Sequence, residues 1–277
     1  MVGDAHMSFR REVQCPDDRI DLGRAALAIA VAEYPDLDME SYVTRIDRLA
    51  AAVRDRSGTE GEPYRLIACL NYVLFNLEGF QGNRGDYYDP KNSFLNDVME
   101  RKTGIPITLS VLYMEVARRI GLTLHGVGFP GHFLVKYVGK DEEIVIDPFH
   151  GGEVRSLEEF EYFLDELTGS DVIFRSEFLS AVSKKQILKR MLSNLKAIYL
   201  HQGDLLKSLS AVERLLILEP NSAQELRDLG LLYLKLDSLA EALKDLESYL
   251  GLAAHAGDAE EIREQVESLQ KRLRQVQ

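Results

Sequence analysis

The sequence predicts an α+β protein, in which a mainly helical first domain holds a small antiparallel sheet and an all-helical repeat domain follows. Three observations support this fold class. Apolar residues recur at helical spacing through residues 19–120, the pattern alternates over 122–147, and beyond residue 186 the chain resembles itself at a shift of 34 residues. The expected divisions are an N-terminal extension (1–18), the first domain (19–180), and repeats with a capping helix (184–277).

Helices are expected over residues 19–34, 38–55 and 63–80, where apolar residues recur every third or fourth position. Pro35 closes the first of these helices, and a loop rich in glycine follows the second. Residues 81–91 are almost all turn formers, so we expect an exposed loop there.

A short helix from Asn92 or Ser93 to Lys102 and a longer one from Pro106 to Ile120 come next. Gly104 is expected to supply the left-handed residue that ends the short helix. A proline suits the first turn of a helix, because its missing N–H has no partner to lose there.

Three short strands are expected over residues 122–128, 132–138 and 143–147, since apolar residues alternate with others in this region. A turn at residues 139–141 would join the last two as a hairpin. Such an antiparallel pair brings His132 and Asp147 to neighbouring strand ends. After the sheet, Ser156 and Glu159 have the spacing of a capping box at the start of another helix.

Charge and cysteine content exclude several classes of function. A net charge of −12, with no basic run longer than a pair, argues against a nucleic acid partner. Cys15 and Cys69 lie too far apart to indicate a disulfide framework or a CxxC metal site, which fits a reducing compartment. No apolar run is long enough to span a membrane, so we expect a cytoplasmic protein. The residues before Met7 are either a natural leader or an expression scar.

The last third of the chain carries the tetratricopeptide signature, a 34-residue period with helix–turn–helix content. Two repeats cover residues 186–252, and the polar segment 258–277 suits a capping helix. Lys196 and Asp237 depart from the pattern, because small residues or glycine are usual at those places. The matched pairs are Leu192 with Leu226, Leu195 with Leu229, Tyr199 with Tyr233, Leu200 with Leu234, Leu205 with Leu239, Leu209 with Leu243, and Leu216 with Leu250.

Three segments of the first domain, residues 92–122, FPGHFLVKY (129–137) and IDPFHGG (146–152), carry a family resemblance. The domain resembles the transglutaminase-like (papain-like) superfamily, and the whole chain is similar to the bacterial SirB regulator family, which joins such a core to tetratricopeptide repeats. Active members of the superfamily place a cysteine at the start of a helix, a histidine on a following strand and an aspartate on the next. The resemblance implies that His132 and Asp147 are this histidine and aspartate.

The nucleophile of that pattern has no counterpart here. Counting back from Gly121, its place falls at or next to Pro106, which has neither a thiol nor a hydroxyl group. Covalent acyl transfer needs an activated sulfur or oxygen. Ser110 lies on the same helix face about 6 Å further along the axis, so a shifted serine nucleophile remains an alternative. Asn92, Pro106 and Ser110 are expected to line the cleft.

A structural pair with Asp147 is the favoured interpretation of His132, and a residual catalytic base or a ligand or metal contact are the alternatives. His125 and His150 are nearby in sequence, but their spacing from His132 matches no recognised metal geometry. We therefore expect neither a metal nor another cofactor.

The leading hypothesis is a noncatalytic protein whose repeats bind a protein or peptide in a regulatory or scaffold role. The alternative is a hydrolase or an acyl or amide transferase, protease- or transglutaminase-like, that uses His132 and Asp147. The resemblance places the concave binding face on the first helix of each repeat. The candidate partner-binding residues there are Arg190, Ser193, Gln224 and Arg227.

Overall fold

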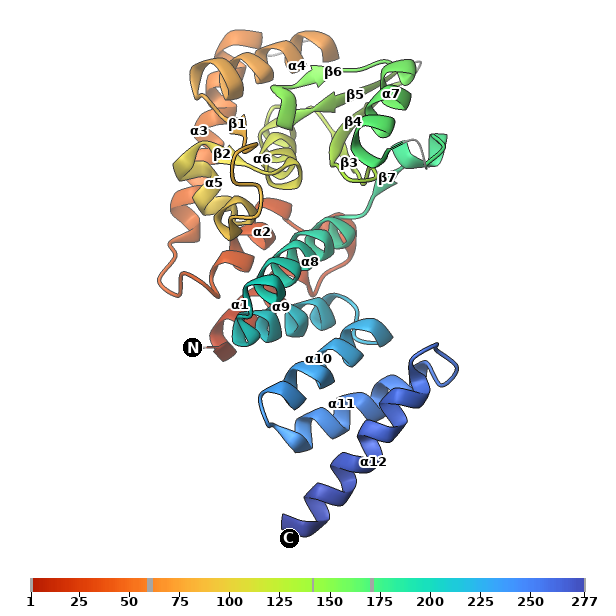
Figure 1. The fold of residues 1–277 in the computed structure, drawn as a ribbon. Coiled ribbons are helices and arrows are strands. Elements are labelled where there is room, and N and C mark those ends of the chain that lie inside the picture. Colours follow the sequence, from red (N-terminus) through yellow and green to blue (C-terminus); the bar gives the residue numbers. More distant parts are fainter. Residues whose placement is uncertain (1, 59–61, 141, 170–171, 277) are drawn as a thin grey trace. The chain divides into compact units, whose positions relative to one another are not determined.

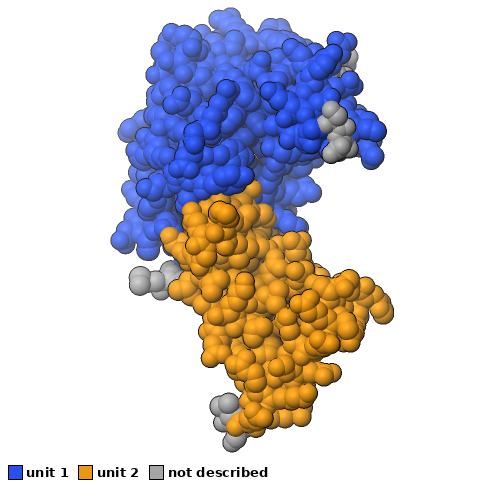
Figure 2. Space-filling model, viewed as in Figure 1, with its two compact units in different colours: residues 1, 3–191 blue, residues 2, 192–277 orange. Residues whose placement is uncertain are grey.

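The structure is a computed structural model that describes residues 2–58, 62–140, 142–169 and 172–276. It confirms the predicted fold class, with a mainly helical region that holds a small antiparallel sheet and a helical region after it (Figure 1). The chain divides into two compact units, the first ending at Met191 and the second starting at Leu192 (Figure 2). This division falls within helix α8 (Lys184–Gln202), and the domain boundaries expected from the sequence remain a prediction.

The first unit begins with a helix, where the sequence predicts only an N-terminal extension. Ala5, Phe9 and Val13 are buried at a spacing of four residues, so α1 (Val2–Val13) has an apolar stripe of its own. This stripe is short and lies among charged residues, so its helical spacing is not apparent in the sequence. The elements that follow, up to the central helix, are η1 (Asp17–Arg19), α2 (Leu22–Ala30), α3 (Met39–Ser57), α4 (Pro63–Asn71), the π-helical turn η2 (Tyr72–Leu77), β1 (Gln81–Gly82), η3 (Pro90–Ser93), α5 (Leu95–Arg101) and β2 (Thr103–Gly104).

Helix α6 (Pro106–Arg119) is the centre of the first unit. Every residue from Pro106 to Ala117 is buried, because α2, α3 and α5 pack around the helix and strands β3 (Leu124–Val127) and β4 (Leu134–Val138) also contact it. A helix that is covered on all sides has no face left for water. Pro106 occupies its first turn, as the sequence predicts.

The expected role of Gly104 is wrong. Lys102, with φ of 55°, is the left-handed residue that ends α5, and Gly104 belongs to β2. Glycine is needed at position 104 for space, since an added Cβ would lie 2.9 Å from Thr108 Oγ1 and 2.9 Å from Val98 Cγ2.

The sheet has five antiparallel strands in the order β6-β5-β4-β3-β7. The three predicted strands are present as β3 (Leu124–Val127), β4 (Leu134–Val138) and β5 (Glu143–Asp147). β6 (Glu153–Val154) and β7 (Ala181–Val182) were not predicted, because two residues are too few to show an alternating pattern.

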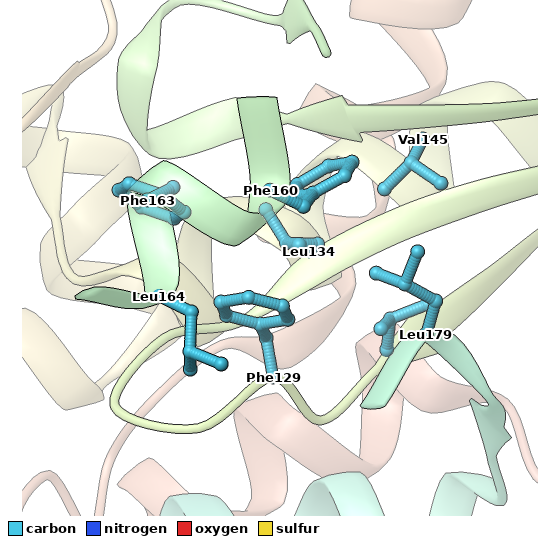
Figure 3. Packing of buried hydrophobic residues seen from close by; sticks show 8 residues of the cluster. Phe129, Leu134, Val145, Phe160, Phe163, Leu164 and Leu179 are labelled. Atoms are coloured by element: carbon cyan, nitrogen blue, oxygen red, sulfur yellow. The ribbon is translucent and has the colours of Figure 1, made fainter. Parts of the chain in front are cut away.

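Helix α7 (Leu157–Thr168) packs on the sheet and forms a second apolar core with it. Figure 3 shows Phe160, Phe163 and Leu164 of α7 gathered with Phe129 and Leu134. The predicted capping box is confirmed. The Ser156 N–H donates to Glu159 Oε2 at 2.6 Å, and the Glu159 N–H donates to Ser156 Oγ at 3.4 Å. Short 3-10 turns η4 (Pro148–His150) and η5 (Ser176–Leu179) flank this region.

The second unit consists of helices that pack against their neighbours in sequence, as in tetratricopeptide repeats. Asp237 adopts the left-handed conformation (φ 57°) at a place where the pattern usually has glycine. Lys196 replaces a small residue and is buried against two carboxylates, with Nζ 2.7 Å from Glu225 Oε2 and 2.5 Å from Asp228 Oδ2. The helices after α8 are α9 (Leu205–Leu218), α10 (Ala223–Lys235), α11 (Leu239–Leu252) and α12 (Ala259–Val276).

The buried charge of Lys196 leads to a stability prediction. We expect Lys196→Ala to lower the free energy of unfolding by about 3–5 kcal/mol, because it leaves the buried Glu225 carboxylate without its cation. Urea denaturation followed by circular dichroism measures the change. Arg272→Ala is the matched control, since Arg272 pairs with Asp237 at an exposed site and its loss should leave stability unchanged within error. Equal effects of the two substitutions would contradict the prediction.

Candidate functional site

The β4–β5 hairpin brings His132 and Asp147 together. Val135 of β4 pairs with Ile146 of β5, so the register places Asp147 beside the start of β4. His132 lies two residues before that strand begins. The His132 Nε2 atom lies 3.0 Å from both carboxylate oxygens of Asp147. The predicted position of the two side chains at neighbouring strand ends is therefore confirmed, while the role of the pair is a separate question.

Asp147 accepts hydrogen bonds from four N–H groups. Besides the His132 ring, the ring of His150 approaches with Nδ1 2.7 Å from Oδ2, and the backbone N–H groups of Phe149 and His150 donate to Oδ1 at 3.0 and 3.3 Å. Burial acts to raise the pKa of Asp147, but the hydrogen bonds from the two histidines outweigh it and hold the pKa well below its ordinary value. Asp147 is therefore an ionised carboxylate inside the protein.

The ionised state of Asp147 fixes the form of both histidine rings. A carboxylate can only accept, so His132 must carry a proton on Nε2 and His150 must carry one on Nδ1. In neutral rings the lone pairs then lie on His132 Nδ1 and His150 Nε2.

His150 belongs to this group, although its spacing in the sequence does not predict this. It lies 18 positions beyond His132 in the sequence, and only the hairpin brings the two rings together, with centroids 5.7 Å apart. A local signal was available, because an aspartate that caps a short turn can accept from a side chain three residues later. His150 is also the more accessible ring, with 21% of its side chain exposed against 4% for His132.

Aromatic rings surround the histidine pair. Phe163 of α7 meets His132 edge-on at 5.1 Å between ring centroids, and Phe149 does so at 5.7 Å. Arg155 lies over Phe163, with Cζ 4.3 Å from the ring centroid. This apolar wall keeps water from most of the His132 ring, which strengthens its hydrogen bond to Asp147.

Neither cysteine is part of this cluster. Among the residues described, the ligand-type side chains that converge are His132, Asp147 and His150 alone. Cys15 lies in the short stretch after α1, and Cys69 lies on α4. Pro106 occupies the first turn of α6 as predicted, and the assignment of this place to the nucleophile remains a prediction from the resemblance.

The hydroxyl groups near the start of α6 have no hydrogen bond to either histidine ring among the described residues. Thr108 Oγ1 accepts from the Ile105 N–H at 3.2 Å and donates to the Asn92 carbonyl at 2.7 Å. The Ser110 Oγ is buried and makes no hydrogen bond within the described part of the chain. A serine nucleophile needs a base in hydrogen-bond reach, and no such contact joins Ser110 to His132 among these residues.

The fully buried Asn92 holds the loop before α5 in place. Its Nδ2 donates to the Asp86 carbonyl at 2.6 Å, and its Oδ1 accepts from Asn83 Nδ2 at 3.0 Å. The expected cap of α5 is wrong, because Phe94 occupies the N-cap position and Asn92 lies in η3.

A cleft of about 680 Å³ lies beside His150. Gly82 allows its walls to approach, since an added Cβ would lie 2.6 Å from the Phe149 ring. The expected cleft residues Asn92, Pro106 and Ser110 do not line this cleft, and their role remains a prediction. The lining residues are Phe80, Gln81, Gly82, Arg84, Phe149, His150, Gly151 and Glu153.

Asn71 of α4 fastens the loop that follows Asp147, which sequence reasoning missed. Its Nδ2 donates to the Gly152 carbonyl at 2.8 Å, and its Oδ1 accepts from the Tyr113 hydroxyl of α6 at 2.8 Å. Gly152 has φ of 80°, and an added Cβ would lie 2.0 Å from Asn71 Oδ1. These contacts tie the Asp147–Gly152 segment to two helices of the unit.

Comparison with known proteins assigns both parts of the chain. Residues 40–193 match the transglutaminase-like superfamily, and residues 195–267 match the tetratricopeptide repeat. A UPF0162 protein of Xylella fastidiosa is 40% identical over 243 residues, which is 85% of each chain. The chain belongs to the transglutaminase-like superfamily and to the UPF0162 family.

Two further proteins are similar to this chain over a smaller share of their length or at lower identity. Human F-box only protein 21 is 35% identical over 147 residues, which is 50% of this chain and 22% of that protein. The crystal structure of menin matches 94% of this chain and 73% of its own with 13% identity and a TM-score of 0.46, which is too weak to support an inference. No helix in the described ranges of this UPF0162 protein has the length and apolar character to cross a membrane.

The candidate binding residues of the repeats lie in different settings. Arg190 is half-buried in the first unit, with Nη1 3.4 Å from the Phe129 carbonyl oxygen and Cζ 5.5 Å from the Phe133 ring centroid. Burial lowers the pKa of Arg190. Arg227 forms an ion pair with Asp258 at 3.0 Å, Ser193 is half-buried and Gln224 is exposed. Their binding role remains a prediction.

The buried carboxylate predicts a pH dependence of stability. The folded pKa of Asp147 lies below its unfolded value of about 3.9, so its contribution is complete above that value and is lost as pH falls toward the folded pKa. We expect the stability difference between the wild type and Asp147→Asn to be of order 2 kcal/mol near pH 6 and to shrink as pH drops from about 5 to 3. Urea titrations at several pH values measure it. A difference that stays constant or grows toward low pH would contradict the assignment.

Proposed function

We propose that this UPF0162 protein is a noncatalytic transglutaminase-like protein that binds a protein or peptide through its tetratricopeptide repeats. The observation that carries the proposal is the bonding of Asp147. The Asp147 carboxylate accepts a hydrogen bond from a ring N–H of each imidazole. No thiol or hydroxyl of the described residues is hydrogen-bonded to either ring. An imidazole without a neighbouring nucleophile supports no covalent acyl transfer.

The packing of His132 supports a structural role for the pair. Its ring is almost fully buried between Phe149 and Phe163, and its Nε2 donates to Asp147. A buried polar group is retained when its hydrogen bonds are complete, and such a pair fixes the position of the strand ends that carry it. The same contacts join β4, β5 and α7, so they stabilise the core as well as the site.

The repeats provide the binding function in this proposal. Tetratricopeptide helices commonly present polar residues on a concave face to peptides, and Gln224 at the start of α10 is exposed. The resemblance to the SirB regulator family supports a regulatory or scaffold role. A cytoplasmic location is part of the proposal and agrees with two free cysteines.

An enzymatic function is the second candidate, because His150 has features of a base. Asp147 orients its ring, its Nε2 carries the free lone pair, and its side chain lines the cleft. In this alternative His150 removes a proton from a water molecule, so that the reaction is a hydrolysis without a covalent intermediate. His132 and Asp147 then position the base.

Site-specific photo-crosslinking tests the binding proposal. We expect Gln224→p-benzoylphenylalanine, in the full-length chain, to yield a discrete adduct in irradiated cells with a protein that wild type also retains in a pull-down. The matched control places the same amino acid at Ser248, which is exposed on α11, the second helix of its repeat. We expect no adduct from that position.

Two results would contradict the noncatalytic binding proposal. The same photoreactive amino acid can be placed at Arg84, which lines the cleft. An adduct from that position, without one from position 224, would assign binding to the first domain. Labelling of one cysteine or serine by an electrophilic probe, abolished by His132→Ala in a folded protein, would show covalent catalysis.

A further inference from the structure

The cluster of His132, Asp147 and His150 has the donor set of a metal site. Each residue offers one ligand atom, and these three atoms lie within 4.8 Å of one another. Two imidazoles and one carboxylate form a ligand set that binds zinc and other divalent first-row metals. Two of the three side chains are buried, so the donors are held by the fold and do not move freely in solvent.

The distances are close to those that coordination needs. The Asp147 Oδ2 atom lies 3.0 Å from His132 Nε2 and 2.7 Å from His150 Nδ1. Tetrahedral zinc, with bonds of about 2.0–2.2 Å, separates its ligand atoms by roughly 3.3–3.5 Å. Each of these two pairs therefore has to separate by less than about 1 Å for an ion to replace the hydrogen-bonded proton. For the pair of histidine nitrogens, the distance is within the 4.8 Å that holds for all three ligand atoms.

The surroundings of Asp147 favour a fixed ligand. Backbone N–H groups of Phe149 and His150 donate to its Oδ1 atom, which orients the carboxylate in the way that outer partners orient metal ligands.

An entry path exists through the cleft. His150 lines it and is partly exposed, whereas His132 and Asp147 are buried and are not among the lining residues. Both rings must carry their proton on the nitrogen that faces away from Asp147 when the metal is bound, which neutral histidine achieves by changing tautomer. Three protein ligands leave at least one position for water or a ligand group.

We propose that His132, Asp147 and His150 form a binding site for a single zinc ion. This inference does not depend on the proposed binding role of the repeats. The spacing of the three residues in the sequence concealed the site, because their convergence is produced by the β4–β5 hairpin and the turn after it.

Zinc binding is measured on the full-length chain by equilibrium dialysis, with the metal content determined by mass spectrometry. We expect about one equivalent of zinc in wild type, with a micromolar or tighter dissociation constant. His150→Gln removes a ligand at the accessible edge and should weaken binding at least tenfold. His125→Gln is the matched control, since His125 is exposed on β3 of the same sheet and does not belong to the cluster.

Cobalt substitution keeps the test informative if a variant is unstable. The wild-type protein with one equivalent of Co²⁺ should show the visible d–d absorption of a low-coordinate site, and excess zinc should remove it. Circular dichroism verifies that His150→Gln is folded, and Asp147→Asn is the second ligand variant. Failure of wild type to bind zinc, or equal affinity in wild type and His150→Gln, would overturn the proposal. Loss of binding in His125→Gln would also overturn it, because it would place the ion elsewhere.

Discussion

The arrangement of the first domain around its site depends on the buried, ionised carboxylate of Asp147. A carboxylate removed from water is costly unless hydrogen bonds replace its hydration. Two imidazole N–H groups and two backbone N–H groups provide that replacement. The register of β4 and β5 delivers one histidine, and the turn after β5 delivers the other together with both backbone donors. The hairpin, the turn and the side chains therefore stabilise each other.

This constraint also limits the chemistry of the site. In the catalytic arrangement of the superfamily, an aspartate orients one histidine and the histidine activates a cysteine. Here Asp147 is shared between two histidines, and Pro106 stands at the start of α6 where the resemblance places the nucleophile. Phe149 and Phe163 shield His132, which leaves His150 as the ring that meets the cleft. Among the described residues, no thiol or hydroxyl group is hydrogen-bonded to either ring, and covalent catalysis requires such a contact.

Patterns in the sequence predicted the long elements of the first domain and the His132–Asp147 contact, because helical and alternating spacing are local properties. Other features depend on contacts that local patterns do not encode. Asn71 reaches Gly152 over 81 positions, and His150 reaches the ring of His132 through the fold of the hairpin. Lys196 departs from the repeat pattern, and the fold explains why, because it brings Glu225 and Asp228 beside the Lys196 ammonium group. Helix α1 escaped prediction because its apolar stripe is narrow and its other positions are mostly polar.

The protonation state of the two imidazole rings tests most directly whether Asp147 is their shared acceptor. Nitrogen-15 NMR of histidine side chains distinguishes the two neutral tautomers and the imidazolium ion. In metal-free protein near pH 7, we expect a proton on Nε2 of His132 and on Nδ1 of His150, with the signal of each nitrogen shifted toward its hydrogen-bonded value. Asp147→Asn should alter both signals. The exposed His125 provides the internal reference, since its signals should not respond. A His132 ring with its proton on Nδ1 alone, or a His150 ring with its proton on Nε2 alone, would contradict the claim that Asp147 is their shared acceptor.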